Sequence, residues 1–142
     1  MLRIIGIVFI FCFSVLLGLY IANNEKQKLY NSKKLFESML TTKMLLKYSK
    51  TDKQKVIKKI DFEYFVECDK SSKIDSEIFS IAKKYFDDMG SRDFNTESEL
   101  LDFTVKDIES KLNPLTIKYN QNVKLSIAMG FLCALFFVII LI

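Results

Sequence analysis

The fold of this chain is decided by two uncharged apolar stretches, IIGIVFIFCFSVLLGLYIA at residues 4–22 and LSIAMGFLCALFFVIILI at residues 125–142. They hold 19 and 18 residues. At a rise of roughly 1.5 Å per residue, a helix of either length reaches about 27 to 29 Å, close to the thickness of the hydrocarbon core of a bilayer. We therefore expect two transmembrane helices, at residues 1–22 and 125–142, that anchor a central domain at residues 23–124.

The distribution of charge places the central domain on one side of the membrane. Of 21 Lys and Arg residues only Arg3 lies outside residues 23–124, and none of the 17 Asp and Glu residues does. Lysines closely follow the first stretch and precede the second, so the positive-inside bias predicts a cytosolic domain and outward-facing termini. A cleaved signal peptide is the alternative for residues 1–22, but Tyr20-Ile21-Ala22 lacks the small residues that cleavage needs.

The composition argues against an enzyme. The chain has no His, the commonest general base and metal ligand at neutral pH, and its four Gly residues form no phosphate-binding loop. Cys12 and Cys133 lie in the apolar stretches and Cys68 stands alone, which predicts neither a disulfide framework nor a zinc site. We expect no catalytic residue, cofactor, metal or small-molecule substrate. Nucleic acid is disfavoured too, because residues 43–59 are basic but contain one aromatic, Tyr48.

Small residues recur at every fourth position in both apolar stretches. In lipid, such a stripe lets two helices approach closely enough for dispersion and weak hydrogen bonds to hold them together. The alternative is chance, because small residues are common in membrane helices. The candidate packing residues are Ser14, Gly18 and Ala22 in the first stretch and Ser126, Gly130 and Ala134 in the second.

The first part of the central domain has a helical period. The first transmembrane helix is expected to continue to about Tyr48, with an apolar face marked by Leu29, Phe36, Leu40 and Leu46. The motif Thr51-Asp52-Lys53-Gln54 is typical of a capping box that begins a new helix. That helix would bury Val56, Ile57, Ile60 and Tyr64, and crowded aromatic residues indicate a break and restart within residues 61–67.

Two more helices are predicted beyond this break. The first has apolar residues at helical spacing from Ile74 to Met89, and Gly90 follows where a left-handed residue would end it. Thr96-Glu97-Ser98-Glu99 predicts the start of the second, whose apolar seam leads into the second transmembrane helix. Pro114 interrupts that seam, so we expect a kink or a short break there. The seam consists of Leu101, Val105, Ile108, Leu112, Leu115 and Tyr119.

These elements predict an all-α fold, an antiparallel helical bundle flanked by N-terminal and C-terminal transmembrane helices. Its charge is segregated: residues 23–60 hold 11 Lys against three acidic residues, and residues 61–109 hold six basic against 14 acidic residues. The basic half could bind a protein partner, or it could complement the acidic half of the same bundle as a solvated face.

Three segments resemble the stage III sporulation protein AB family of endospore-forming bacteria. The first stretch, with Gly6, Gly18 and Ala22, is similar to the start of the family. Met89-Gly90 with Asp93 and Thr96 looks like its Leu-Gly-x-x-Asp turn, and residues 130–135 (GFLCAL) look like its Gly-Phe-Leu-x-Gly-Leu ending. The chain departs from the family at residues 45–53, where it keeps only Tyr48 and Thr51 of the motif Glu-x-x-Tyr-Gly-x-Thr-Pro-Leu. It departs also in a short segment at residues 68–72 and at Pro114.

The resemblance implies a non-catalytic membrane platform subunit of a secretion-like channel complex between mother cell and forespore, with its helical domain in the mother-cell cytosol. The implied partners are the bilayer, a cognate secretion-type ATPase and other membrane proteins of the complex. The alternative is a stand-alone scaffold or receptor with two anchors. Candidate contacts with the ATPase are Lys50, Lys53, Lys55, Lys58, Lys59, Gly90 and Asp93.

The two-anchor topology makes a direct prediction. The full chain should stay in the membrane fraction after an alkaline carbonate wash, and protease added to intact cells should leave residues 23–124 uncut. Immunoblotting of washed membranes and of protease-treated cells measures both. Release by carbonate, or digestion of the central residues from outside, would contradict the topology.

Overall fold

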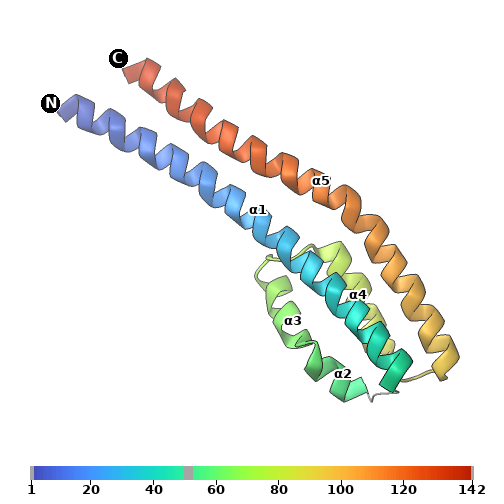
Figure 1. Ribbon diagram of the computed structural model, residues 1–142. Coiled ribbons are helices and arrows are strands. Elements are labelled where there is room, and N and C mark those ends of the chain that lie inside the picture. The colour runs from blue at the N-terminus through green and yellow to red at the C-terminus, as the bar shows by residue number, and fades with distance from the viewer. Residues whose placement is uncertain (1, 50–52, 142) are drawn as a thin grey trace. The chain divides into compact units, whose positions relative to one another are not determined.

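The structure is a computed structural model that describes residues 2–49 and 53–141. These residues form five helices and no strand (Figure 1), which confirms the predicted all-α class. The first helix runs unbroken from the first apolar stretch to Ser49, as expected. The helices are α1 (Leu2–Ser49), α2 (Lys53–Lys59), α3 (Phe62–Lys70), α4 (Ser76–Asp88) and α5 (Phe94–Leu141).

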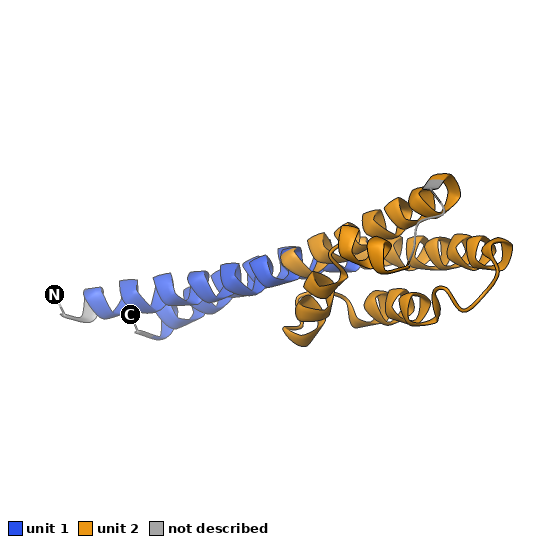
Figure 2. Ribbon diagram, turned by 90° about the horizontal axis from the view of Figure 1, so that it is seen from below, with its two compact units in different colours: residues 1–26, 117–142 blue, residues 27–116 orange. Residues whose placement is uncertain are grey.

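The chain divides into two compact units, drawn in different colours in Figure 2. The terminal unit comprises Met1–Lys26 and Ile117–Ile142, the beginning of α1 and the end of α5, and the central unit comprises Gln27–Thr116. Each long helix therefore contributes to both units. The terminal unit extends beyond the two apolar stretches, to Lys26 in α1 and back to Ile117 in α5.

The apolar side chains of the terminal unit point mostly outward. Of the most apolar 18-residue window, 11% is buried in α1 and 17% in α5, whereas the core helix of a soluble protein is mostly buried. Phe9 is 75% exposed and Ile139 is 74% exposed. Water is a poor solvent for such a surface. Both helices are long and apolar enough to cross a membrane, so the terminal unit is suited to association with a bilayer.

The central unit has its own apolar core, to which every helix contributes. Phe62 packs against Phe79 and Phe86, with ring centroids 6.0 and 4.7 Å away. The seam predicted in α5 lies in this core, since Leu101 and Ile108 are buried. The largest fully buried apolar side chains are Leu35 and Met39 of α1, Val56 of α2, Phe65 of α3, Ile78 and Phe86 of α4, and Leu101 and Ile108 of α5.

The buried face of α1 differs from the expected one. Of the four residues expected on it, Leu46 is buried, and Leu29, Phe36 and Leu40 are only partly buried. The fully buried residues are Leu35 and Met39 together with three polar ones, Asn31, Ser32 and Thr42. Because polar residues occupy part of the buried face, the spacing of apolar residues alone points to the wrong side of the helix.

The helix ends agree with the sequence in part. α2 and α3 are separated at residues 60–61, at the start of the interval 61–67 in which an interruption was expected, and Asp61 has a left-handed φ of 52° there. α2 begins at Lys53, but Thr51 and Asp52 of the predicted capping box lie outside the described residues. α5 continues through Pro114, so the expected short break is absent there. A kink at Pro114 stays a prediction.

The predicted cap of α5 is wrong. Thr96 lies inside the helix, which begins at Phe94. Asp93 is the capping residue: its carboxylate accepts hydrogen bonds from the Thr96 amide at 3.3 Å and the Thr96 hydroxyl at 2.6 Å. An aspartate and a threonine are both good capping residues, so the sequence offered two starts three residues apart. The structure uses the earlier one.

Polar contacts join α1 to the α3–α4 segment. The Asn31 side chain is 1% exposed, and its Nδ2 donates to the carbonyl oxygen of Lys73 at 2.7 Å. The Tyr64 hydroxyl donates to Asn31 Oδ1 at 3.1 Å. Ser32 accepts a hydrogen bond from the Asp75 amide at 3.1 Å. These bonds fix the position of α1 along its axis, which apolar contacts alone would leave less defined.

Replacing Asn31 should destabilise the central unit strongly. Asn31→Leu leaves the Lys73 carbonyl and the Tyr64 hydroxyl, which are both part-buried, without their partner, at about 1 to 2 kcal/mol for each group. Denaturant unfolding of the detergent-solubilised full chain should show a loss of about 2 to 4 kcal/mol. Asn113→Leu, at an exposed position of α5, should change stability by less than about 0.5 kcal/mol. Equal effects of the two substitutions would refute the role of Asn31.

Candidate functional site

The two stripes of small residues meet within the terminal unit. A Cβ atom added to Gly18 would lie 2.9 Å from the carbonyl oxygen of Ser126 and 3.1 Å from Cα of Gly130. A Cβ atom added to Gly130 would lie 3.1 Å from Cα of Gly18 and 3.2 Å from the carbonyl oxygen of Ser14. The obstacles are backbone atoms, which cannot turn aside as side chains can. At this crossing each helix therefore requires a glycine.

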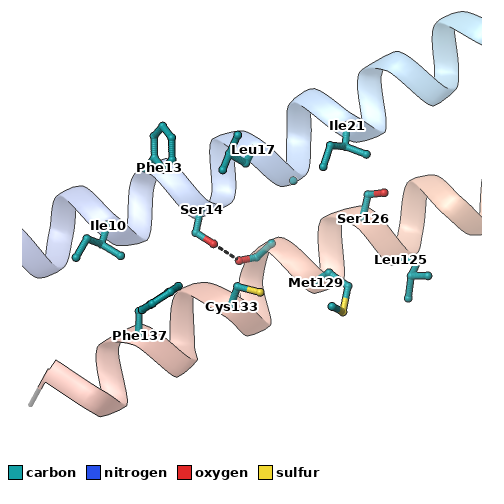
Figure 3. Close-up of a pocket in the computed structure, with 12 residues that line it drawn as sticks. Ile10, Phe13, Ser14, Leu17, Ile21, Leu125, Ser126, Met129, Cys133 and Phe137 are labelled. Atoms are coloured by element: carbon teal, nitrogen blue, oxygen red, sulfur yellow. Dashed lines mark hydrogen bonds between the residues drawn. The ribbon is translucent and has the colours of Figure 1, made fainter. Parts of the chain in front are cut away.

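The remaining stripe residues lie along the same contact. The Ser14 hydroxyl donates a hydrogen bond to the Gly130 carbonyl at 3.0 Å, drawn as the dashed line in Figure 3. Ala22 is 3% exposed and Ala134 is fully buried, and Ser126 is half-buried. An interhelical hydrogen bond within a membrane contributes about 0.6 kcal/mol on average. Close packing of the backbones therefore contributes alongside this bond.

An open apolar groove of about 680 Å³ runs beside this crossing (Figure 3). Ile10, Leu17 and Phe137 are among its lining residues. The groove also contains Cys133, whereas Cys12 is exposed on α1. Its surface is suited to hydrocarbon and offers little for polar chemistry.

Among the candidate partner residues, Lys53 contacts the chain itself. Its Nζ donates to the carbonyl oxygen of Asp87 at 3.0 Å, in the last turn of α4. A lysine at this place satisfies an orphan carbonyl and opposes the negative end of the helix dipole. Its side chain also lies 3.8 Å from the position that a Cβ of Gly90 would take. The structure thus brings Lys53 and Gly90 together.

The other lysines of α2 differ in position. Lys55, Lys58 and Lys59 are exposed, and we call these three residues the lysine edge. No ion pair is found for them within the described part of the chain. Lys50 lies outside the described residues. The lysine edge is therefore a positive surface without an ion pair to any residue that the structure describes.

Other charges are matched within the bundle. Lys43 Nζ lies 2.8 Å from Asp102 Oδ1, and Lys111 pairs with Glu77. Arg92 Nη2 lies 3.4 Å from Asp88 Oδ2. This ion pair reduces the repulsion between the Asp88 carboxylate and the negative, C-terminal end of the α4 dipole. Complementation between the basic and acidic halves thus accounts for Lys43 but not for the lysine edge.

The turn between α4 and α5 is held by contacts within the chain itself. Gly90 has a φ of 85°, in the left-handed region that favours glycine, and its amide donates to Glu97 Oε2 at 3.2 Å. Glu97 is 5% exposed. Burial raises the pKa of the Tyr85 hydroxyl far above its ordinary value, and the neighbouring Glu97 carboxylate adds to the rise. The hydrogen bond from the Thr96 hydroxyl lowers the pKa of Asp93.

At this turn Gly90 provides the left-handed backbone conformation and Asp93 caps α5. Sequence analysis placed the third member, Glu97, in a capping box and missed its burial and its bond to the Gly90 amide. The available signal was its place four residues before Leu101, on the buried face of α5, where an acidic residue needs a partner. As for metals, the described residues bring together no group of three or more acidic or cysteine side chains that could hold an ion.

Comparison with known protein families gives a match over most of this architecture. The family model for stage III sporulation protein AB matches residues 62–142, more than half of the chain. These residues include α3, α4, α5 and the Gly90 turn, whereas the lysine edge on α2 lies outside the match. No curated protein and no solved structure matches the chain.

The glycine crossing makes a prediction with a matched control. With the native cysteines replaced by serine, Ile10→Cys and Phe137→Cys place two thiols along the same groove. Gly18→Leu should reduce their crosslinking severalfold in membranes, because its Cβ would overlap backbone of α5. Gly6→Leu should leave it unchanged, since a Cβ at Gly6 meets nothing within 4 Å. If both variants crosslink like the parent, the crossing does not hold the helices together.

Proposed function

Since the chain belongs to the stage III sporulation protein AB family, we propose that it is a non-catalytic membrane platform subunit of a sporulation-specific, secretion-like channel complex. In this role the terminal unit anchors the protein in the mother-cell side of the forespore envelope. The central unit faces the mother-cell cytosol and couples a secretion-type ATPase to the other membrane proteins of the complex.

The observation that carries the proposal is that the two units of one chain present different kinds of surface. The terminal unit presents apolar side chains outward, and the central unit buries its apolar side chains in a core of its own. A subunit that relays work between a membrane assembly and a soluble motor needs both kinds of surface. The helices α1 and α5 each contribute residues to both units.

The orientation is supported by the lysines next to the membrane segments. Lys26 and Lys28 follow the first apolar stretch, and Lys118 and Lys124 precede the second. Positive charge of this kind favours the cytosolic face. This would place the central unit in the compartment that supplies nucleotide to an ATPase.

The lysine edge supports a partner with an acidic surface. Its three exposed ammonium groups have no ion pair within the described residues, and each would gain from an opposing carboxylate. Lys53 is excluded from the proposed contact because it caps α4. The proposed contact is therefore limited to the lysine edge and does not include the whole basic segment.

The buried polar side chains of the central unit support a structural role rather than a catalytic one. Glu97 accepts a hydrogen bond from the Gly90 amide in the α4–α5 turn, and Asn31 connects α1 to the α3–α4 segment. Each of these groups is used to hold helices in place. A rigid bundle of this kind can transmit displacement from one contact surface to another.

Reversing the lysine edge tests the coupling. The detergent-solubilised full chain should retain the secretion-type ATPase of the same sporulation complex in a pull-down. Lys55→Glu, Lys58→Glu and Lys59→Glu together should weaken retention by on the order of tenfold or more, because like charges then face the partner. The matched control reverses three exposed lysines elsewhere in the central unit, Lys70, Lys83 and Lys106.

The outcome separates the platform from a stand-alone anchored scaffold. Loss of the ATPase only on reversal of the lysine edge supports the platform and its contact. Equal loss in both triple variants would point to bulk charge and contradict the proposed surface. No retention by the parent chain would contradict the platform role.

A further inference from the structure

A second surface of the central unit, away from the lysine edge, combines a cavity with an exposed aromatic ring. The cavity lies between α4 and α5, has a volume of about 350 Å³, and is lined by Ile81, Tyr85, Leu100 and Thr104 among others. Phe103 also lines the cavity and is 69% exposed. A single exposed Phe is common on a water-exposed protein surface. Here the same surface carries both an exposed ring and a cavity that could receive such a ring.

Part of the cavity lining, made by Ile81, Leu100 and Thr104, can accept an apolar group. The Thr104 hydroxyl already donates to the carbonyl oxygen of Leu100 at 2.8 Å, so a ring entering the cavity does not deprive it of a partner. Ile81 and Leu100 are partly exposed and would lose contact with water. Removal of such apolar area from water is favourable.

The charges around the cavity are balanced. Lys84 and Arg92 carry two positive charges, Asp88 and Asp107 carry two negative charges, and all four side chains line the cavity. Arg92 and Asp88 form an ion pair at 3.4 Å. A strongly charged partner would gain little here, whereas a second copy of the same face meets no net repulsion. The lysine edge, with three positive charges, would repel its own copy.

We propose that this face binds the same face of a second copy of the chain in a two-fold symmetric dimer. Phe103 of each copy enters the cavity between α4 and α5 of the other. In a two-fold interface each patch meets its own copy, so a ring and a hollow side by side on one surface complement each other reciprocally.

Anchoring helps this association. Copies held in one membrane share an orientation and are confined to a thin layer, which raises their effective concentration and lets a small patch suffice. The two-fold axis then runs perpendicular to the membrane plane. This inference does not depend on the ATPase contact, because the two surfaces share no residue.

The test uses the full chain in bilayer nanodiscs or liposomes, with the native cysteines replaced by serine. A cysteine at the cavity, Asp107→Cys, should form a disulfide-linked dimer on mild oxidation, and a cysteine on α2, Lys55→Cys, should stay monomeric. Adding Phe103→Asp to the Asp107→Cys chain should lower the yield by on the order of tenfold, as expected for loss of a central aromatic anchor. Adding Tyr48→Asp, at an aromatic residue that is 79% exposed on α1, should not.

Phe103→Ser serves as a second variant that adds no charge, and circular dichroism of each variant should match the parent because Phe103 lies outside the core. Crosslinking that depends on Phe103 and occurs at position 107 supports the dimer. A parent that does not crosslink at position 107, a yield unaffected by both Phe103 variants, or equal crosslinking through position 55 would overturn it.

Discussion

Two apolar helices dissolved in lipid gain nothing from hiding apolar surface from one another, because hydrocarbon surrounds them in either case. The terminal unit therefore depends on how closely two backbones can approach. At Gly18 and Gly130 the approach is so close that a single added carbon on either residue would overlap backbone of the other helix. The Ser14 hydroxyl, bonded to the carbonyl of Gly130, lies at the same crossing. In a bilayer, dispersion at short range would replace the hydrophobic effect as the source of stability in this unit.

The central unit obeys the opposite rule. There the apolar side chains of five helices are removed from water into one core, and the side chain of Asn31, buried beside it, has hydrogen-bond partners. Burial of the Asn31 amide is unfavourable unless both its oxygen and its nitrogen have hydrogen-bond partners. With those partners in place, the side chain fixes α1 against the α3–α4 segment. A single chain thus uses two different physical principles along α1, with the change occurring where the helix passes from one unit to the other.

The sequence predicted most of the helical architecture because its signals there are strong. The length of α1, the left-handed Gly90 and the seam of α5 from Leu101 to Leu112 all follow from periodicity and turn chemistry. The buried face of α1 was misjudged, since Asn31, Ser32 and Thr42 look like surface residues until their partners are known. The start of α5 was misjudged as well, because Asp93 and Thr96 are both competent caps and only the surrounding turn decides between them. Lys53 looked like part of a basic surface, and its bond to Asp87 depends on a fold that brings distant segments together.

The lysine edge lies on the most lightly held element of the bundle. α2 has seven residues, too few for a stable helix on its own, and Val56 is its one fully buried residue within the described chain. Asp61, in a left-handed conformation that costs an ordinary residue about 1 kcal/mol, follows it closely. Such a segment opens locally at low free energy while the core beneath it stays folded. A partner that binds this surface, as proposed above, would also have to order α2, which lowers the net binding free energy and favours rapid release.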